Sequence, residues 1–192
     1  SPAAGERASF TDRRGNTTRH TYDTRGFLSS VADSLGHVET LRHDDLGRVL
    51  ERRDPLGNAT LYTWTADGFL VRSDGPEGGS LLLERNERKD VTTITVNGRT
   101  ADMVYDHCHR PLTVTNALGQ VASFTYRPDG LLIERSVTTA DGSRTRSWTY
   151  DYDDRGNLFR ERGPAGGEPL RYEHDAAGRV ISSTDGEGNR TE

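Results

Sequence analysis

Three consecutive residues, His107, Cys108 and His109, are the part of this sequence that most resembles a metal-binding cluster. Imidazole and thiolate groups are common Zn²⁺ ligands. However, adjacent residues of a strand or turn point to different sides, so three neighbours rarely converge on one ion. The sequence has no second cysteine to complete a tetrahedral set, and it has no phosphate-binding or dinucleotide-binding glycine pattern. We therefore interpret this segment as a turn and expect no metal and no cofactor.

Carboxylates are numerous enough to suggest a catalytic pair, and Asp54-Pro55-Leu56-Gly57 is the most distinctive segment that contains one. It falls at the same place in a repeating pattern as the segments that begin at Asp33 and Asn116. Asp or Asn is favoured at the first position of a turn and Pro at the second. We interpret Asp54 as a turn former and predict that the chain is not an enzyme.

Aromatic side chains recur at regular intervals and could stack on sugar rings. The set comprises Tyr22, Trp64, Tyr105, Tyr126, Tyr152 and Tyr172. Equivalent residues of successive hairpins lie two strands apart, roughly 10 Å, with one strand between them whose aliphatic residue can fill the gap. We favour a structural aromatic ladder and keep a carbohydrate-binding surface as the alternative.

These residues belong to a repeat of about 21 residues. Its core begins with an aromatic residue or histidine, which is followed by a polar residue that is most often Asp. A Gly lies three residues after that polar residue, as in Tyr22-Asp23-Thr24-Arg25-Gly26 and Tyr152-Asp153-Asp154-Arg155-Gly156. A second Asp-x-x-Gly segment lies between successive cores, and a gap of about two periods separates Trp64 from Tyr105. The turn and repeat positions that we expect to be structural are Tyr22, Asp23, Gly26, Gly36, Asp44, Gly47, Asp54, Gly57, Gly68, Tyr105, Gly119, Tyr126, Gly130, Tyr152, Asp153, Gly156, Gly178 and Gly188.

Two four-residue turns in each period leave two segments of strand length, so each repeat is predicted to be a pair of antiparallel strands. An aliphatic residue follows each recognisable core turn, and polar residues dominate beyond it, which indicates an apolar stripe near a strand end. No helical apolar period is sustained. The sequence predicts an all-β fold in which residues 1–192 form one array of about eight hairpin repeats.

Composition limits the possible partners. The net charge is −5 and only 31% of residues are hydrophobic, so neither a nucleic-acid surface nor a thick core is expected. Lys89 is the one lysine among 25 Lys and Arg residues, which reflects either coding bias or arginines that stack on aromatics and pair with carboxylates. No apolar run is long enough to cross a bilayer, and the first residues do not resemble a signal peptide.

The Tyr-Asp-x-x-Gly-x-Leu core with a following Asp-x-x-Gly resembles the YD or Rhs repeats of bacterial polymorphic toxins, insecticidal toxin complex components and teneurins. The resemblance covers roughly residues 10–192. It implies a long sheet that spirals into a hollow shell enclosing a toxin polypeptide. It also implies that the chain is made in the bacterial cytoplasm and exported, and that its partners are further repeats, the toxin and, in the alternative, cell-surface glycans. The family ends its shell with a self-cleavage segment; Asp54-Pro55-Leu56-Gly57 echoes part of it but is interpreted here as a turn.

Open sheet edges are a further expectation. The sequence places the first strand near Thr17 to Thr21 and the last near Val180 to Thr184. Unpaired strands at these positions would invite another strand. We therefore predict that the isolated chain associates edge to edge, or else that these strands stay paired with the preceding and following repeats of a larger shell.

Overall fold

The computed structural model describes residues 7–192, and within that range the regular structure is 18 β-strands and one short 3₁₀ turn, with no α-helix. The predicted all-β class is confirmed. The elements are β1 (Arg7–Thr11), β2 (Thr17–Tyr22), β3 (Leu28–Ala32), β4 (Val38–His43), β5 (Val49–Arg53), β6 (Ala59–Trp64), β7 (Leu70–Asp74), η1 (Pro76–Gly78), β8 (Ser80–Arg85), β9 (Val91–Val96), β10 (Arg99–Tyr105), β11 (Pro111–Thr115), β12 (Val121–Tyr126), β13 (Leu132–Thr138), β14 (Thr145–Tyr152), β15 (Leu158–Arg162), β16 (Leu170–His174), β17 (Val180–Thr184) and β18 (Arg190–Thr191).

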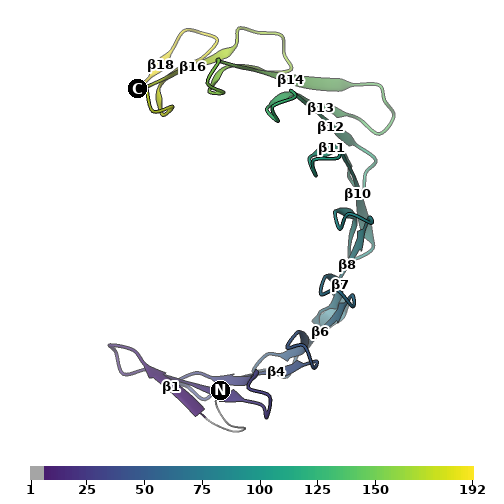
Figure 1. The fold of residues 1–192 in the computed structure, drawn as a ribbon, viewed down its shortest axis with the longest axis vertical. Helices are drawn as coiled ribbons and strands as arrows, with labels where there is room; N and C mark the ends of the chain where they lie inside the picture. Colours follow the sequence, from purple (N-terminus) through teal and green to yellow (C-terminus); the bar gives the residue numbers. More distant parts are fainter. Residues whose placement is uncertain (1–6) are drawn as a thin grey trace. The chain divides into compact units, whose positions relative to one another are not determined.

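The chain divides into two compact units, and strands of each are labelled in Figure 1. Unit 1 contains the described residues up to Arg85 together with Thr93–Arg99, and unit 2 contains Asn86–Thr92 and Thr100–Glu192. Within unit 1, strands β1 to β8 each pair antiparallel with the next strand along the chain. Strands β10 to β18 of unit 2 do the same. Each unit is therefore a run of consecutive hairpins.

Two kinds of turn alternate along these hairpins. Those that follow the repeat core, here called core turns, begin at Asp23, Asp44, Thr65, Asn86, Asp106, Arg127, Asp153 and Asp175. Second turns of the same hydrogen-bonding pattern begin at Asp12, Asp33, Asp54, Asn116 and Asp185. In the turn that begins at Asp44, the Asp44 N–H donates to the Arg48 carbonyl at 3.0 Å and the Gly47 N–H donates to the Asp44 carbonyl at 3.2 Å. Gly47 has φ of +80°, the left-handed conformation that closes a type I turn.

The core that seemed to be missing between Trp64 and Tyr105 lies at Asn86–Asp90. The Asn86 N–H donates to the Asp90 carbonyl, and the Lys89 N–H donates to the Asn86 carbonyl, each at 3.0 Å. Lys89 takes the place of the turn glycine with φ of +72°, as His109 does with φ of +62° in the next core turn. The copy escaped detection because neither its aromatic residue nor its glycine is present in the sequence.

A β-bulge recurs in most of the hairpins that a core turn closes. In each of these hairpins the bulge lies beside the core aromatic residue or histidine. In one case Thr63 lies opposite Arg72 but Trp64 lies opposite Leu70, so Val71 is the extra residue. Because two bulge residues oppose a single partner, two consecutive side chains lie beside the core residue. This accounts for the paired residues that start these strands: Leu28-Ser29, Val49-Leu50, Leu70-Val71, Pro111-Leu112, Leu132-Ile133, Leu158-Phe159 and Val180-Ile181.

No hydrophobic residue among residues 8–192 is buried, as expected for hairpins that form a single layer. The predicted edge strands were wrong. The strand near Thr17 pairs with β1, and the strand near Val180 pairs with β18. The second turns at Asp12 and Asp185 each require a strand on their outer side, and the outer strands lack the core residues that mark a repeat. Edge-to-edge association stays a prediction.

Candidate functional site

The turn residues expected from the sequence lie in the hairpin turns and at the strand ends beside them. Each turn aspartate uses its carboxylate on its own turn, as Asp54 illustrates. Its Oδ1 accepts the N–H groups of Leu56 and Asn58 at 2.9 Å, and its Oδ2 accepts the Asn58 side-chain amide at 2.8 Å. These bonds lower the pKa of Asp54, with the Asn58 side-chain bond contributing most. The carboxylate is therefore stabilised as an anion that caps the turn.

Asp106 shows the same arrangement with an arginine as partner. Partial burial acts to raise the pKa of Asp106, but it is outweighed by the Arg110 side chain and by the N–H groups of Arg110 and Cys108, so the pKa falls to about 2. Arg110 Nε donates to Asp106 Oδ2 at 2.7 Å. A carboxyl group with this pKa is ionised at neutral pH and holds no proton to donate as a general acid.

The His107-Cys108-His109 segment forms the exposed part of that core turn. The Cys108 N–H donates to Asp106 Oδ1 at 2.8 Å, and the thiol is free and exposed. His109 Nδ1 instead makes a short hydrogen bond with Asp90 of the preceding core turn. Across residues 7–192, no group of three His, Cys, Asp or Glu side chains is arranged to hold a metal ion.

The core aromatics tie each repeat to the one before it. Trp64 Nε1 donates to the Val49 carbonyl at 2.8 Å, and the Tyr152 hydroxyl donates to the Leu132 carbonyl at 2.9 Å. Val49 and Leu132 occupy the same position, the first residue of a bulge. A bulge disrupts the ladder and leaves backbone groups in need of partners. These two bonds favour the structural ladder over an exposed stacking platform.

Arginines form a second set of links between successive core turns. Arg25 Nη1 donates to the Asp44 carbonyl, Arg48 Nη1 to the Thr65 carbonyl, Arg88 Nη2 to the Asp106 carbonyl and Arg110 Nη1 to the Arg127 carbonyl. Arg110 also lies 4.7 Å above the ring centre of Tyr126. Arginine suits this position because its planar, multi-donor group can bond a carboxylate, a carbonyl and a ring at once. The structure thus places arginines both on aromatic rings and on carboxylates.

The two faces of each sheet differ in chemistry. Cross-strand partners share a face and alternate residues along a strand lie on opposite faces, so the pairing register assigns each residue to one of them. One face, here called the aromatic face, carries His20, Tyr22, Leu41, His43, Tyr62 and Trp64 in unit 1, and Met103, Tyr105, Phe124, Tyr126, Trp148, Tyr150, Tyr152 and Tyr172 in unit 2. The opposite, polar face carries Thr21, Thr40, Arg42 and Thr63 in unit 1, and Thr113, Ser123, Thr125, Glu134, Ser136 and Thr149 in unit 2.

The aromatic face is partly shielded from water even without a second layer. The pKa values of four tyrosines on this face are raised, and burial is the largest cause in each case: Tyr126, Tyr150, Tyr152 and Tyr172. On the polar face, by contrast, the apolar Leu61 is 47% exposed. The single apolar stripe expected from the sequence is therefore part of the wider aromatic face, which also carries charged residues such as Arg135 and Glu161.

Several members of the aromatic face were missed by the sequence analysis, notably Tyr62, Phe124 and Tyr150. Each lies two residues before a core aromatic. Strand alternation places residues two apart on the same face, and this spacing was the signal that could have identified them. The core residue drew attention because it marks the repeat, whereas the residue two positions before it varies among His, Leu, Tyr, Met and Phe.

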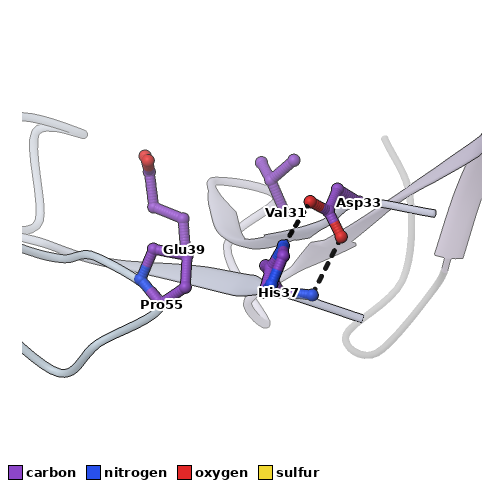
Figure 2. A pocket seen from close by; sticks show the side chains of 5 residues that line it. All are labelled: Val31, Asp33, His37, Glu39 and Pro55. Carbon is purple, nitrogen blue, oxygen red and sulfur yellow. Dashed lines mark hydrogen bonds and ion pairs between the residues drawn. The ribbon is translucent and has the colours of Figure 1, made fainter. Parts of the chain in front are cut away.

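Small notches lie beside the second turns. One of about 250 Å³ is lined by Val31, Asp33, His37, Glu39 and Pro55 (Figure 2). In Figure 2 the His37 ring and backbone N–H both reach the Asp33 carboxylate, with Nδ1 at 2.8 Å from Oδ2. A second notch, lined by Arg52, Asp54, Asn58, Thr60 and Pro76, repeats these five positions 21 residues later. Such notches thus recur with the period of the sequence.

Comparison with known proteins agrees with the repeat analysis. A family model described as RHS Repeat matches residues 43–80 and 152–190. The chain therefore contains Rhs repeats at both of these stretches. This match confirms the resemblance inferred from the Tyr-Asp cores. Within residues 7–192, no helix has the length and apolar character needed to cross a bilayer.

Two curated relatives align with almost the whole Rhs-repeat chain. Double-stranded DNA deaminase toxin A of Burkholderia cenocepacia (strain H111) is 32% identical over 204 residues, covering 92% of this chain and 14% of that protein. Probable deoxyribonuclease RhsB of Dickeya dadantii (strain 3937) is 30% identical over 192 residues, covering 85% of this chain and 13% of that protein. The chain spans about one seventh of each relative. The activities in those names therefore describe the longer proteins.

Solved toxin structures share the fold. The Photorhabdus luminescens Tc holotoxin pore, in a TccC3 mutant form, matches 92% of this chain with a TM-score of 0.58 at 13% identity. The crystal structure of TcdB2-TccC3-TEV matches 95% with a TM-score of 0.59 at 16% identity. The chain covers 12% and 13% of those two chains. The hairpin array is thus an arrangement also found in Tc toxin proteins.

Proposed function

We propose that this chain is a stretch of wall in a larger Rhs shell that encloses a toxin polypeptide, with the aromatic face of each unit turned toward that polypeptide. The observation that carries the proposal is a single-layer sheet with one face rich in aromatic residues and no buried hydrophobic residue in the part of the chain described. An apolar sheet face ordinarily packs against another layer. In this proposal the toxin polypeptide supplies that layer, while the polar face meets solvent.

The relatives support this assignment. The two curated proteins bear the names of a toxin and a deoxyribonuclease, and each is about seven times longer than the matched segment. We infer that the two units are parts of one array that continues with further repeats of the parent protein. We also infer that the parent is made in the bacterial cytoplasm and exported with its toxin.

In this proposal the segment has a structural role and leaves catalysis to other parts of the parent. The turn aspartates support it, because their carboxylate oxygens are occupied by turn N–H groups and side chains, as at Asp54. A pure preparation of this chain is expected to have no hydrolase activity. Activity that disappears on Asp54→Ala, with the fold retained, would overturn this part of the proposal.

Photo-crosslinking in the parent protein tests which face meets the toxin. A benzoylphenylalanine is introduced at Tyr62, on the aromatic face, or at Thr63, its neighbour on the polar face of the same strand. We expect cross-links to the toxin polypeptide from position 62 and none from position 63. Equal yields from both positions, or cross-links from position 63 alone, would contradict the proposed orientation.

The alternative function, recognition of cell-surface glycans by the aromatics, predicts a different result. On a glycan array the chain would bind saturably, and Trp64→Ala would abolish binding. We expect no such binding, since the hydrogen bond from the Trp64 indole N–H to the Val49 carbonyl gives the ring a structural role between successive repeats.

A further inference from the structure

A notch in unit 2 differs in charge from those of unit 1. It has a volume of about 260 Å³ and is lined by Gln120, Val137, Thr139, Arg144 and Arg146. Val137 and Arg146 are cross-strand partners on β13 and β14, next to the pair formed by Ala122 and Val137. Phe124 lies two residues from Ala122 on β12, so the notch opens on the aromatic face of this unit.

Within residues 7–192, the side-chain N–H groups of Gln120, Arg144 and Arg146 in this notch have no acceptor. Arg144 and Arg146 are exposed, and neither has an ion pair with any of the residues that the structure describes. Elsewhere in unit 2, Arg110 and Arg160 each hold a carboxylate at 2.6 Å. Gln120 is oriented by Asn116, whose side-chain amide donates to Gln120 Oε1 at 2.8 Å. This bond leaves the Gln120 NH₂ group free to donate to a ligand.

The carboxylate in the turn of the same hairpin already accepts hydrogen bonds within that turn. Asp141 accepts hydrogen bonds from Thr139 Oγ1 at 2.6 Å and from the Ser143 N–H at 3.0 Å. The Thr139 side chain and the Ser143 N–H and hydroxyl lower the pKa of Asp141 to about 2. Asp141 does not line the notch. The charge of the two arginines is therefore not cancelled inside it.

The unit 1 notches are built differently. Asp33 and Glu39 line the first of them, and Asp54 lines the second. Arg52, the arginine of the second notch, donates to Glu39 Oε2 of the first at 2.6 Å. The two unit 1 notches therefore contain carboxylates of their own. The unit 2 notch contains two arginines and an amide but no carboxylate.

We propose that Gln120, Arg144 and Arg146 form a binding site for a carboxylate of a polypeptide segment lying on the aromatic face of unit 2. The proposal rests on the proposed function, which places a polypeptide on that face. A guanidinium group matches a carboxylate through two parallel N–H···O bonds. Val137 adds an apolar wall, which suits the methylene groups of a glutamate side chain better than a free inorganic anion.

The test is an NMR titration of the 192-residue chain with N-acetyl-glutamate N-methylamide, following the side-chain resonances of Gln120, Arg144 and Arg146. The corresponding glutamine compound is the uncharged control, and inorganic phosphate is the rival anion. Arg144→Gln and Arg146→Gln test the site. Arg155→Gln, an exposed core-turn arginine of the same unit, is the matched control variant.

We expect saturable shifts with a dissociation constant on the order of 1 mM, the range of weak single-group binding. Each notch variant should weaken binding at least tenfold with spectra otherwise unchanged, whereas Arg155→Gln should have no effect. Absence of saturable shifts, insensitivity to both variants, or tighter binding of phosphate than of the glutamate compound would overturn the proposal. The titration contains no toxin, so its failure and a failure of the Tyr62 cross-linking are separate results.

Discussion

Gly47 and Gly57 offer a matched pair for testing how the repeats pack. Both occupy the fourth position of a turn, with φ of +80° and +85°. A Cβ added at Gly57 meets nothing within 4 Å, whereas one added at Gly47 would lie 2.6 Å from Cε1 and 2.9 Å from Cζ of Phe27 in the preceding core turn. The two sites therefore share the backbone cost of an alanine and differ in the contact with Phe27.

The backbone cost of a left-handed alanine is about 1–2 kcal/mol, and it applies to both Gly47→Ala and Gly57→Ala. At Gly47 the Phe27 ring must also move. That ring lies 5.5 Å from the His43 ring and 5.2 Å from the Arg25 guanidinium carbon, so moving it disturbs both contacts. Overpacking of this kind adds about 1–3 kcal/mol. Gly47→Ala is thus expected to lower the free energy of unfolding by about 1–3 kcal/mol more than Gly57→Ala.

Urea unfolding followed by circular dichroism measures the difference, and Phe27→Ala closes a double-mutant cycle. In the Phe27→Ala background the ring is absent, so Gly47→Ala should cost no more than Gly57→Ala does in the parent sequence. If Gly47→Ala and Gly57→Ala destabilise the chain equally, or if the extra cost persists without Phe27, the inferred packing between successive core turns is incorrect.

Three further predictions concern the links between repeats and the turn aspartates. Arg48→Ala removes the bond to the Thr65 carbonyl and should lower the unfolding free energy by about 1–3 kcal/mol in urea titrations. Trp64→Phe keeps an aromatic ring but leaves the Val49 carbonyl without its donor, at a cost of about 1–2 kcal/mol in the same assay. The turn aspartates have lowered pKa values, that of Asp106 being about 2, so the stability they contribute is present above the usual Asp pKa of about 4 and is lost as pH falls toward 2. The urea midpoint should therefore fall between pH 4 and pH 2.

The two substitutions have matched controls. Arg19→Ala removes an exposed arginine of the polar face, and Tyr62→Phe removes an aromatic-face hydroxyl; both should change stability by less than about 0.5 kcal/mol. If these control variants lose as much unfolding free energy as Arg48→Ala and Trp64→Phe, the links between repeats contribute no more to stability than other exposed side chains do. A urea midpoint that is the same at pH 5 and pH 2 would contradict the role given to the aspartates.

The hairpin repeat could be predicted from the sequence because its turns depend on local chemistry. An aspartate that caps its own turn and a glycine with positive φ need no distant partner, so Asp44 and Gly47 mark their turn in the sequence alone. The copy at Asn86–Asp90 was missed because asparagine and Lys89 adopt the same turn without its usual residues.

Other features depend on pairing between strands and could not be predicted from the repeat core alone. The extra residue at Val71 is defined by its register against Trp64, and the link from Arg48 to Thr65 joins residues 17 positions apart. The absence of carboxylates from the Arg144 notch likewise depends on which residues neighbouring hairpins bring together. These properties follow from register, which the core pattern does not specify.

The structure of the whole parent protein with its toxin is the most direct test of the proposed function. We predict toxin polypeptide in contact with Tyr62 in unit 1 and with Phe124 and Tyr150 in unit 2, while Thr63 and Thr125 on the opposite face meet solvent. Toxin polypeptide lying against Thr63 and Thr125, with the aromatic faces covered by another part of the parent, would contradict it.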